Sequence, residues 1–308
     1  MKIQILMSVY SGSRYIRTQL DSIAEQTITN KTLLIRDDGS TDDTIEIIKE
    51  YQRRYSWISL YRGDNIGVQR SFLDLISHAD EEADYVALAD QDDLWFPDKL
   101  EQAVKCMEQM DGKLPLLYCS DKEIVGKNLE PINVTVSRVV RKISFGNALV
   151  QNICTGCTAV MNQNLVQLVK GCLPVNPESI IMHDWWLYLT ASCFGEVYYD
   201  TNTYIKYRQH GGNTSGAMLN RRSLLKYRLE QLMKPRGEIY RQAACFRESY
   251  KKKLEDTAKK KERDMLDQLL LAEKKIGKRI RLALDSRYFR QKRGDDIVFR
   301  AIVLVGKL

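Results

Sequence analysis

Three aspartates fall within four residues, directly after an apolar stretch, and residues of this type at this spacing can bind a metal ion. They are Asp90, Asp92 and Asp93, and the apolar stretch is residues 85–89. Mg²⁺ and Mn²⁺ prefer oxygen ligands and commonly take only one or two from the protein, while phosphate and water complete the shell. A solvated turn is the alternative, because an isolated Asp-x-Asp is too short to be specific. The motif alone therefore leaves both interpretations open.

A second acidic pair, Asp37 and Asp38, ends another apolar stretch. The four residues at 40–43 that follow are Ser, Thr, Asp and Asp, which commonly accept hydrogen bonds from free amides at a helix start. Capping explains those four residues. Capping does not explain the two acids Asp37 and Asp38, because close like charges repel unless a hydrogen-bond donor or a positive charge is bound between them. We therefore expect Asp37 or Asp38 to contact a ligand.

The elements that must position these acids alternate between strand and helix. Buried apolar runs predict the strands, and amphipathic periodicity predicts the helices between them. This alternation is typical of an α/β fold with a mostly parallel sheet flanked by helices, in which ligands collect at the carboxyl ends of the strands. The expected strands are residues 3–9, 32–35, 58–61 and 85–89, and the expected helices are residues 15–26, 42–55 and 68–78.

The two parts of the chain differ in charge. Residues 217–308 contain 26 Lys and Arg against 12 Asp and Glu, which gives +14, and subtraction from the totals of 47 and 40 leaves −7 for residues 1–216. The Gly-rich run at 211–216 is typical of a loop. We therefore expect an acidic domain over residues 1–216 and a basic region over residues 217–308.

Composition also predicts the compartment. The chain has seven cysteines, and an odd number in mostly apolar surroundings fits reduced thiols better than a disulfide framework. No run approaches the roughly 18 to 20 apolar residues of a membrane-spanning helix. Both observations predict a cytoplasmic protein.

Seven motifs occur in an order and spacing that resemble a known family. They are "ILMSVYSGSRYIRTQLDSIAEQT" (5–27), "IRDDGSTDDT" (35–44), "DNIGVQRSF" (64–72), "LADQDDLWFPDKL" (88–100), "TGCTAVMN" (155–162), "MHDWW" (182–186) and "YRQHGGNTSG" (207–216). Together they resemble the family-2 glycosyltransferases of GT-A fold, particularly the bacterial rhamnosyltransferase-like branch. The resemblance implies a Rossmann-like, mostly parallel mixed sheet, with a nucleotide-sugar half over about residues 1–95, an acceptor half over about 96–216 and a C-terminal helical extension.

The resemblance also implies which residues hold the donor. The nucleotide base would lie against Tyr10 and the carboxylate of Asp38, with Asp37 adjacent, because a carboxylate accepts the N3–H of uracil or thymine. Arg70 matches a basic position near the diphosphate. The chain departs from the family at Ser71, where Asn is common.

The same comparison assigns the metal site. Asp90 would approach the ribose or a metal-bound water, and Asp92 would ligate a Mn²⁺ or Mg²⁺ ion that bridges the two phosphates. His210 matches a position that contacts metal or diphosphate in related enzymes. A packed or surface histidine is the alternative for His210.

On the acceptor side, the resemblance implies that Asp184 is the general base. Such a base takes the proton of the acceptor hydroxyl as its oxygen attacks the anomeric carbon, and attack from the opposite face inverts that centre. A helix N-cap role for Asp184 is compatible with this. Gly156 and Trp185 would line the acceptor side.

The sequence thus predicts an inverting glycosyltransferase that moves a sugar from dTDP-rhamnose, or a hexose from a UDP-sugar, onto a glycan or lipid-linked acceptor in cell-surface polysaccharide synthesis. A nucleotidyltransferase of similar α/β design is an alternative, and it would release pyrophosphate instead of a nucleoside diphosphate. A basic nucleic-acid-binding protein is a second alternative, but it leaves the acidic strand ends without a purpose.

Apolar residues in the basic region recur at three- and four-residue spacing and predict helices. Solvated packing faces are the simplest interpretation of their charged sides. We prefer peripheral association with the anionic inner face of the cell membrane, where lipid-linked acceptors reside. The two apolar stripes are Ile239, Ala243, Phe246, Tyr250 and Leu254, and Leu266, Leu269, Leu270, Ile276 and Ile280.

Overall fold

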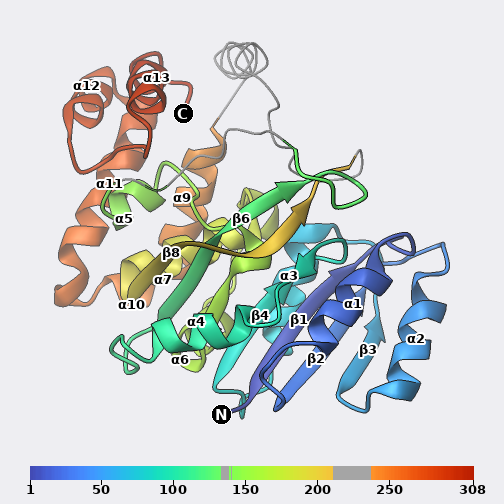
Figure 1. Ribbon diagram of the computed structural model, residues 1–308. Helices are drawn as coiled ribbons and strands as arrows, with labels where there is room; N and C mark the ends of the chain where they lie inside the picture. The colour runs from blue at the N-terminus through green and yellow to red at the C-terminus, as the bar shows by residue number, and fades with distance from the viewer. Residues whose placement is uncertain (133–138, 140, 211–236) are drawn as a thin grey trace. The chain divides into compact units, whose positions relative to one another are not determined.

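The computed structural model describes the chain except for residues 133–138, 140 and 211–236 (Figure 1). It divides into two compact units. The first unit comprises Met1–Asn133, Cys154–Gly171 and Phe194–Ala217, and the second comprises Val134–Ile153, Cys172–Cys193 and Met218–Leu308. The second unit thus includes two segments that precede the predicted boundary. That boundary, near residue 216, and the Gly-rich run at 211–216 lie outside the described residues and stay predictions.

Within the described residues, the first unit contains one eight-stranded sheet with the strand order β3-β2-β1-β4-β7-β6-β8-β5. β1, β2, β3 and β4 are parallel to one another, β7 is antiparallel to β4 and β6, and β8 runs parallel to β6 and antiparallel to β5. The predicted mostly parallel mixed sheet is confirmed. The strands are β1 Ile3–Val9, β2 Lys31–Asp37, β3 Ile58–Arg62, β4 Tyr85–Ala89, β5 Leu94–Trp95, β6 Leu116–Val125, β7 Val160–Asn162 and β8 Glu196–Arg208.

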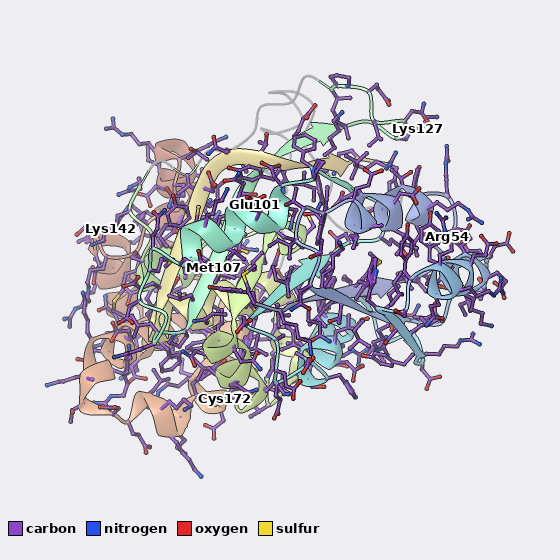
Figure 2. All side chains as sticks on the ribbon, turned by 60° about the horizontal axis from the view of Figure 1, so that its bottom comes forward. Arg54, Glu101, Met107, Lys127, Lys142 and Cys172 are labelled. Carbon is purple, nitrogen blue, oxygen red and sulfur yellow. The ribbon has the colours of Figure 1, made fainter. Side chains whose placement is uncertain are left out.

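Helices flank this sheet because its central strands are apolar on both faces. β1 and β4 are buried at nearly every position, and α4 buries Leu100, Val104 and Met107 in the same core. Figure 2 labels Met107 on this helix. The three helices predicted before residue 80 are present within two residues of their expected bounds. The helices of this unit are α1 Ile16–Ala24, α2 Thr44–Arg54, α3 Val68–Ser77, α4 Lys99–Met107 and α6 Gln163–Lys170, with a 3₁₀ turn, η1, at Gly156–Thr158.

The second unit is helical in its described residues. An aromatic cluster forms its core, in which the Trp186 and Phe246 ring centroids lie 5.3 Å apart and those of Phe246 and Tyr250 lie 4.6 Å apart. The Tyr250 hydroxyl also hydrogen-bonds Thr190 at 2.9 Å. The helices are α5 Phe145–Ala148, α7 His183–Phe194 (whose last residue falls in the first unit), α9 Glu238–Ser249, α10 Lys251–Leu254, α11 Lys260–Lys274, α12 Ile276–Leu284 and α13 Arg293–Leu304, with 3₁₀ turns η2 Pro177–Ser179 and η3 Thr257–Lys259.

The first predicted apolar stripe of the basic region is buried throughout, from Ile239 to Leu254. The second is buried only in part, because the backbone of Lys275 is extended (φ −130°, ψ 122°) and separates α11 from α12. The break changes the phase of the helix, so that Ile276 and Ile280 lie on an exposed face instead of continuing the buried face of Leu266 and Leu269. None of the helices in the described part of the chain combines the length and apolar character that a membrane crossing requires.

Candidate active site

The carboxyl ends of three neighbouring strands bring most of the predicted donor-site residues of the first unit to one edge. In the sheet register, Val9 at the end of β1 is paired with Asp37 at the end of β2, and Met7 is paired with Ala89 at the end of β4. The residues that follow each strand therefore emerge at the same edge. These are Tyr10 after β1, Asp38 after β2 and Asp90 after β4.

The carboxylate of Asp38 is buried and is already contacted by several donors of the protein. It accepts hydrogen bonds from the backbone N–H of Ile66 at 3.0 Å and of Gly67 at 2.9 Å. The buried guanidinium of Arg36 donates to it as well, and this guanidinium also pairs with Asp74 at 2.9 Å. Asp38 therefore fixes the turn that leads into α3, and Gly67 adopts φ +81° there, a conformation that favours glycine.

Asp37 is fully buried and has partners of its own. Its carboxylate accepts from the backbone N–H of Ser40 at 3.2 and 3.3 Å, and Arg62 Nε lies 3.5 Å away. Arginines of the protein thus offset the charge of both acids, so the repulsion between them does not by itself require a ligand. The nucleotide contacts of Asp37 and Asp38 stay predictions.

Gln91 joins the end of β1 to the acidic motif after β4. Its side-chain amide accepts from the Tyr10 N–H at 2.9 Å and donates to the Tyr10 carbonyl at 3.1 Å, an arrangement that we call the amide clamp. The Tyr10 side chain is half exposed, as a residue that stacks on a ligand would be. Gly12 is necessary for this approach, because a Cβ at that position would overlap the Gln91 amide.

Asp92 and His210 are adjacent although they are far apart in sequence. His210 Nε2 lies 2.7 Å from Asp92 Oδ2, and the His210 ring stacks on Tyr15 with centroids 4.7 Å apart. Arg208 contacts the other face of this motif: its Nε donates to the Asp92 carbonyl at 2.6 Å and its backbone N–H to Asp93 Oδ1 at 3.1 Å. The end of β8 thus holds the acidic motif in place and delivers His210 to it.

The third aspartate of the motif, Asp93, is more deeply buried than the other two. One carboxylate oxygen each from Asp90 and Asp93 and the Sγ of Cys157 lie within 4.8 Å of one another. Asp93 is fully buried, and burial raises the pKa of its carboxyl well above the ordinary value, with the nearby charges of Asp90 and Asp92 acting in the same direction. Asp93 is therefore suited to a structural role in which it holds the end of β8 through the Arg208 N–H.

Lys99 is a second fully buried ionisable group, and the charge of Asp93 acts on it. Its ammonium is fully buried and lies 3.7 Å from the centroid of the Trp95 ring. Burial lowers the pKa of Lys99 to about 8, while the charges of Cys157 and Asp93 act in the opposite direction. Among the described residues, neither Lys99 Nζ nor Asp93 Oδ2 has a hydrogen-bond partner. Asp93 and Lys99 are therefore an acid and a base that are both buried away from water behind the acidic motif.

The donor set fits a divalent cation. A carboxylate oxygen and an imidazole nitrogen already converge at Asp92 and His210, both of which retain some solvent access. Oxygen and imidazole nitrogen are ligand types that Mn²⁺ accepts, and one or two protein ligands suffice when phosphate and water supply the others. Asp90, partly exposed, lies two residues before Asp92 in the same motif.

Arg70 lies at the start of α3, exposed, with its Nε donating to the Ile66 carbonyl at 2.7 Å. Ser71, where the family commonly has Asn, is buried, and its hydroxyl lies 2.5 Å from that of Ser8 and 3.2 Å from Arg36 Nη1. Ser71 thus serves the packing of α3 on β1. Gly156 opens η1 next to Cys157 and is also buried.

The two remaining predicted residues belong to the second unit. Asp184 is in the first turn of α7, is mostly buried and accepts a hydrogen bond from Asn152 Nδ2 at 2.9 Å. The Trp185 indole donates to the Ala148 carbonyl at 2.7 Å. Asn152 therefore orients the carboxylate that we predict to be the base.

Sequence reasoning missed four residues that support the site. Gln91 was inside the acidic motif and Arg208 was two residues before His210, so their positions were a usable signal. No periodicity or spacing indicated that Tyr15 would stack on a residue almost 200 positions later, or that Lys99 would be buried.

A mostly parallel mixed sheet with helices on its faces and acidic residues at its carboxyl edge is the arrangement that the resemblance to GT-A glycosyltransferases implies. The family model described as glycosyl transferase family 2 matches residues 4–161, which is just over half of the chain. The chain therefore belongs to glycosyl transferase family 2, and the predicted family and fold are confirmed.

Named relatives agree with this assignment. The chain is 29% identical over 243 residues to the dTDP-rhamnosyl transferase RfbG of Shigella flexneri, which covers 76% of this chain and 81% of that protein. It is 36% identical over 110 residues to the putative glycosyltransferase EpsE of Bacillus subtilis, which covers 35% of this chain and 39% of that protein. The chain is thus a glycosyltransferase, and the nucleotidyltransferase and nucleic-acid-binding alternatives are not favoured.

Solved structures share the fold. S. aureus TarS, in complex with UDP-GlcNAc, matches with a TM-score of 0.59 at 15% identity over 99% of this chain and 91% of that one. The mannosyltransferase PcManGT from Pyrobaculum calidifontis, in complex with GDP-Man and Mn²⁺, matches with a TM-score of 0.53 at 16% identity over 99% and 74% of the two chains.

Proposed function

We propose that this glycosyltransferase takes its sugar from a pyrimidine nucleotide-sugar, with dTDP-rhamnose as the first candidate and a UDP-hexose as the second. The dTDP-rhamnosyl transferase named above supports the first choice, and the fold neighbour in complex with UDP-GlcNAc supports the second. The observation that carries the nucleotide-sugar part of the proposal is the Asp92–His210 pair, 2.7 Å apart, together with the half-exposed Tyr10; the choice of a pyrimidine base is supported by the two comparisons.

In this proposal the residues of the first unit bind the donor. Tyr10 stacks on the base, Asp37 and Asp38 with the turn at residues 66 and 67 form its surroundings, and Arg70 approaches the diphosphate. Asp90 contacts the ribose or a metal-bound water. A positive charge beside the phosphates would stabilise the nucleoside diphosphate, because this leaving group is negatively charged at neutral pH.

Asp92 and His210 would hold a divalent cation, with Mn²⁺ as the candidate that the imidazole nitrogen favours over Mg²⁺. When bound, such an ion offsets the negative charge that develops on the departing diphosphate. The amide clamp and Arg208 contribute by fixing the backbone on either side of the ligands, so that little reorganisation is required when the donor binds.

For the transfer itself, we propose that Asp184 takes the proton of the acceptor hydroxyl while its oxygen attacks the anomeric carbon. Asn152 donates to Asp184 Oδ1 and so orients the carboxylate that would accept this proton. Attack opposite the diphosphate inverts the anomeric centre. Trp185 and Gly156 would line the acceptor, which we propose to be a glycan or lipid-linked saccharide of the cell surface, reached at the cytoplasmic face of the membrane.

The donor proposal is tested by thermal stabilisation and by slow donor hydrolysis with dTDP-rhamnose, UDP-glucose and GDP-mannose, each with Mn²⁺, with Mg²⁺ and with chelator. We expect stabilisation by the two pyrimidine donors, strongest with Mn²⁺. Preference for the guanine nucleotide, or equal binding in chelator, would contradict the proposal.

Two variants separate the proposed roles. Asp92→Ala should remove the metal-dependent part of donor affinity, and Asp184→Asn should leave donor affinity intact while abolishing transfer to an acceptor. Glu25→Ala, which removes an exposed acid of the first unit, is the matched control. Undiminished transfer by Asp184→Asn would refute the base assignment.

A further inference from the structure

α12 exposes a stripe of large apolar side chains that no described residue covers. Ile276, Ile280 and Leu284 recur at every fourth position and are therefore on one face of the helix. Their exposed fractions are 71%, 48% and 78%. Single exposed apolar residues are common on proteins, but a continuous row of three is not.

α13 exposes a second stripe. Ile297 is 69% exposed, Leu304 46% and Val305 60%, while Phe299, Ile302 and Val303 on the opposite side are buried. The two helices pack on each other, and α12 also packs on α11, through their buried faces (Figure 1). The exposed stripes are thus additional to the apolar surface that holds these helices together.

The segment that carries both stripes is positively charged overall. Residues 271–308 contain eleven Lys and Arg and four Asp and Glu, a net charge of +7. Lys274, Lys275 and Arg281 are exposed next to the α12 stripe, and Arg293 is exposed at the start of α13. An apolar face bordered by Lys and Arg is the pattern of a helix that lies in the interface of an anionic bilayer.

We propose that α12 and α13 form a membrane-docking surface, composed of Ile276, Ile280, Leu284, Ile297, Leu304 and Val305, that binds an anionic lipid bilayer without crossing it. The apolar stripes enter the boundary between headgroups and acyl chains, and the surrounding Lys and Arg side chains contact the lipid phosphates. This deepens the proposed membrane association, because it names the residues that enter the lipid.

Charge decides between a bilayer and a second copy of the chain. A self-associated interface would bring two surfaces of the same positive sign together, and like charges repel. An anionic bilayer attracts the same surface, and each nearby Lys or Arg contributes roughly a fivefold increase in binding. The bilayer is therefore the occupant that the charges favour.

The test is sedimentation of the full chain with vesicles of equal parts phosphatidylglycerol and phosphatidylcholine, and with vesicles of phosphatidylcholine alone, at low and high salt. We expect binding to the anionic vesicles at low salt, with weaker binding at high salt. Failure to sediment with the anionic vesicles, or equal sedimentation with both kinds, would overturn the proposal.

Variants separate insertion from simple charge attraction. Ile276→Ser with Ile280→Ser should weaken vesicle binding at least roughly tenfold, because two apolar side chains no longer enter the lipid. Lys274→Gln with Lys275→Gln should weaken binding to anionic vesicles only. Val175→Ser, at an exposed apolar residue of the same unit outside this surface, should bind as the wild type does.

If the isoleucine variants bind unchanged while the lysine variants do not, the stripes do not insert and the proposal fails. Light scattering without vesicles tests the alternative. If the wild type is a dimer and the isoleucine variants are monomers, the stripes form an interface with a second copy of the chain and the proposal fails. Circular dichroism verifies that each variant is folded. No substrate is present in these assays, so their outcome is independent of the donor proposal, which thermal stabilisation tests.

Discussion

Replacing Asp38 by alanine should loosen the turn before α3 as well as weaken donor binding. The substitution leaves the amides of Ile66 and Gly67 without their acceptor and removes one carboxylate from the buried Arg36. A hydrogen bond to a charged group contributes about 1.5–3 kcal/mol. Since about 1.4 kcal/mol corresponds to a factor of ten, hydrogen exchange at these two amides should accelerate roughly ten- to 150-fold.

The same substitution should lower global stability. Removing one partner of a buried ion pair costs about 3–5 kcal/mol, and Asp74, which still pairs with Arg36, places the expected loss near the lower end, at about 3 kcal/mol. The assay is amide hydrogen exchange together with the urea midpoint of unfolding. Asp43→Ala is the control, because Asp43 makes no capping hydrogen bond at the start of α2.

One result would refute this reasoning. If Asp38→Ala lost donor affinity while the exchange rates of Ile66 and Gly67 and the urea midpoint stayed at their wild-type values, the carboxylate would act on the ligand alone. The turn would then be held by something other than the contacts described above.

Three further outcomes are expected. Gly12→Ala should weaken nucleotide-sugar affinity roughly tenfold by calorimetry, because the added Cβ displaces the amide clamp and its two hydrogen bonds; unchanged affinity would count against the clamp. Hydrogen bonds from Arg287 lower the pKa of Asp285 to about 2, below its unfolded value of about 3.9. Ionised Asp285 therefore contributes about 2 kcal/mol to the free energy of unfolding above pH 5, and this contribution is lost as the pH falls toward 2. Asp285→Asn should therefore reduce the urea midpoint at pH 7 but match the wild type near pH 2, and a constant difference across that range would contradict the linkage. Burial raises the pKa of the Cys193 thiol, whereas Cys172 is partly exposed. After alkylation of the native protein at pH 8, mass spectrometry should therefore find Cys193 unmodified and Cys172 modified more readily. Equal labelling of the two thiols would disprove the difference in access.

The fold was predictable because its signals are local. Apolar runs marked β1 to β4 within a few residues, and the strand–helix alternation implied that their carboxyl ends meet at one edge. The short strand β5, two residues long, was not predictable, because it exists only through its pairing with Ile205 and Lys206 of β8. The interruption at Lys275 was missed because the apolar spacing continues across it.

The site was predictable in its residue types but not in its partners. A carboxylate at a strand end has the same appearance in sequence whether it faces a ligand or an arginine two residues earlier, as Asp38 faces Arg36. The proximity of Asp92 to His210 depends on β8, which begins more than 100 residues after the acidic motif. Motif resemblance selected both residues, but the distance between them required the three-dimensional structure.

The way the second unit is assembled from the chain has a consequence for synthesis on the ribosome. Its three segments, Val134–Ile153, Cys172–Cys193 and Met218–Leu308, emerge at different times, and the Trp186 ring cannot pack on Phe246 until the last of them has left the exit tunnel. The sheet of the first unit can be complete once β8 has left the exit tunnel. Chains released from the ribosome after residue 217 should therefore carry a formed sheet together with two stretches that have not yet packed against their helical partners, and chaperones would bind such chains.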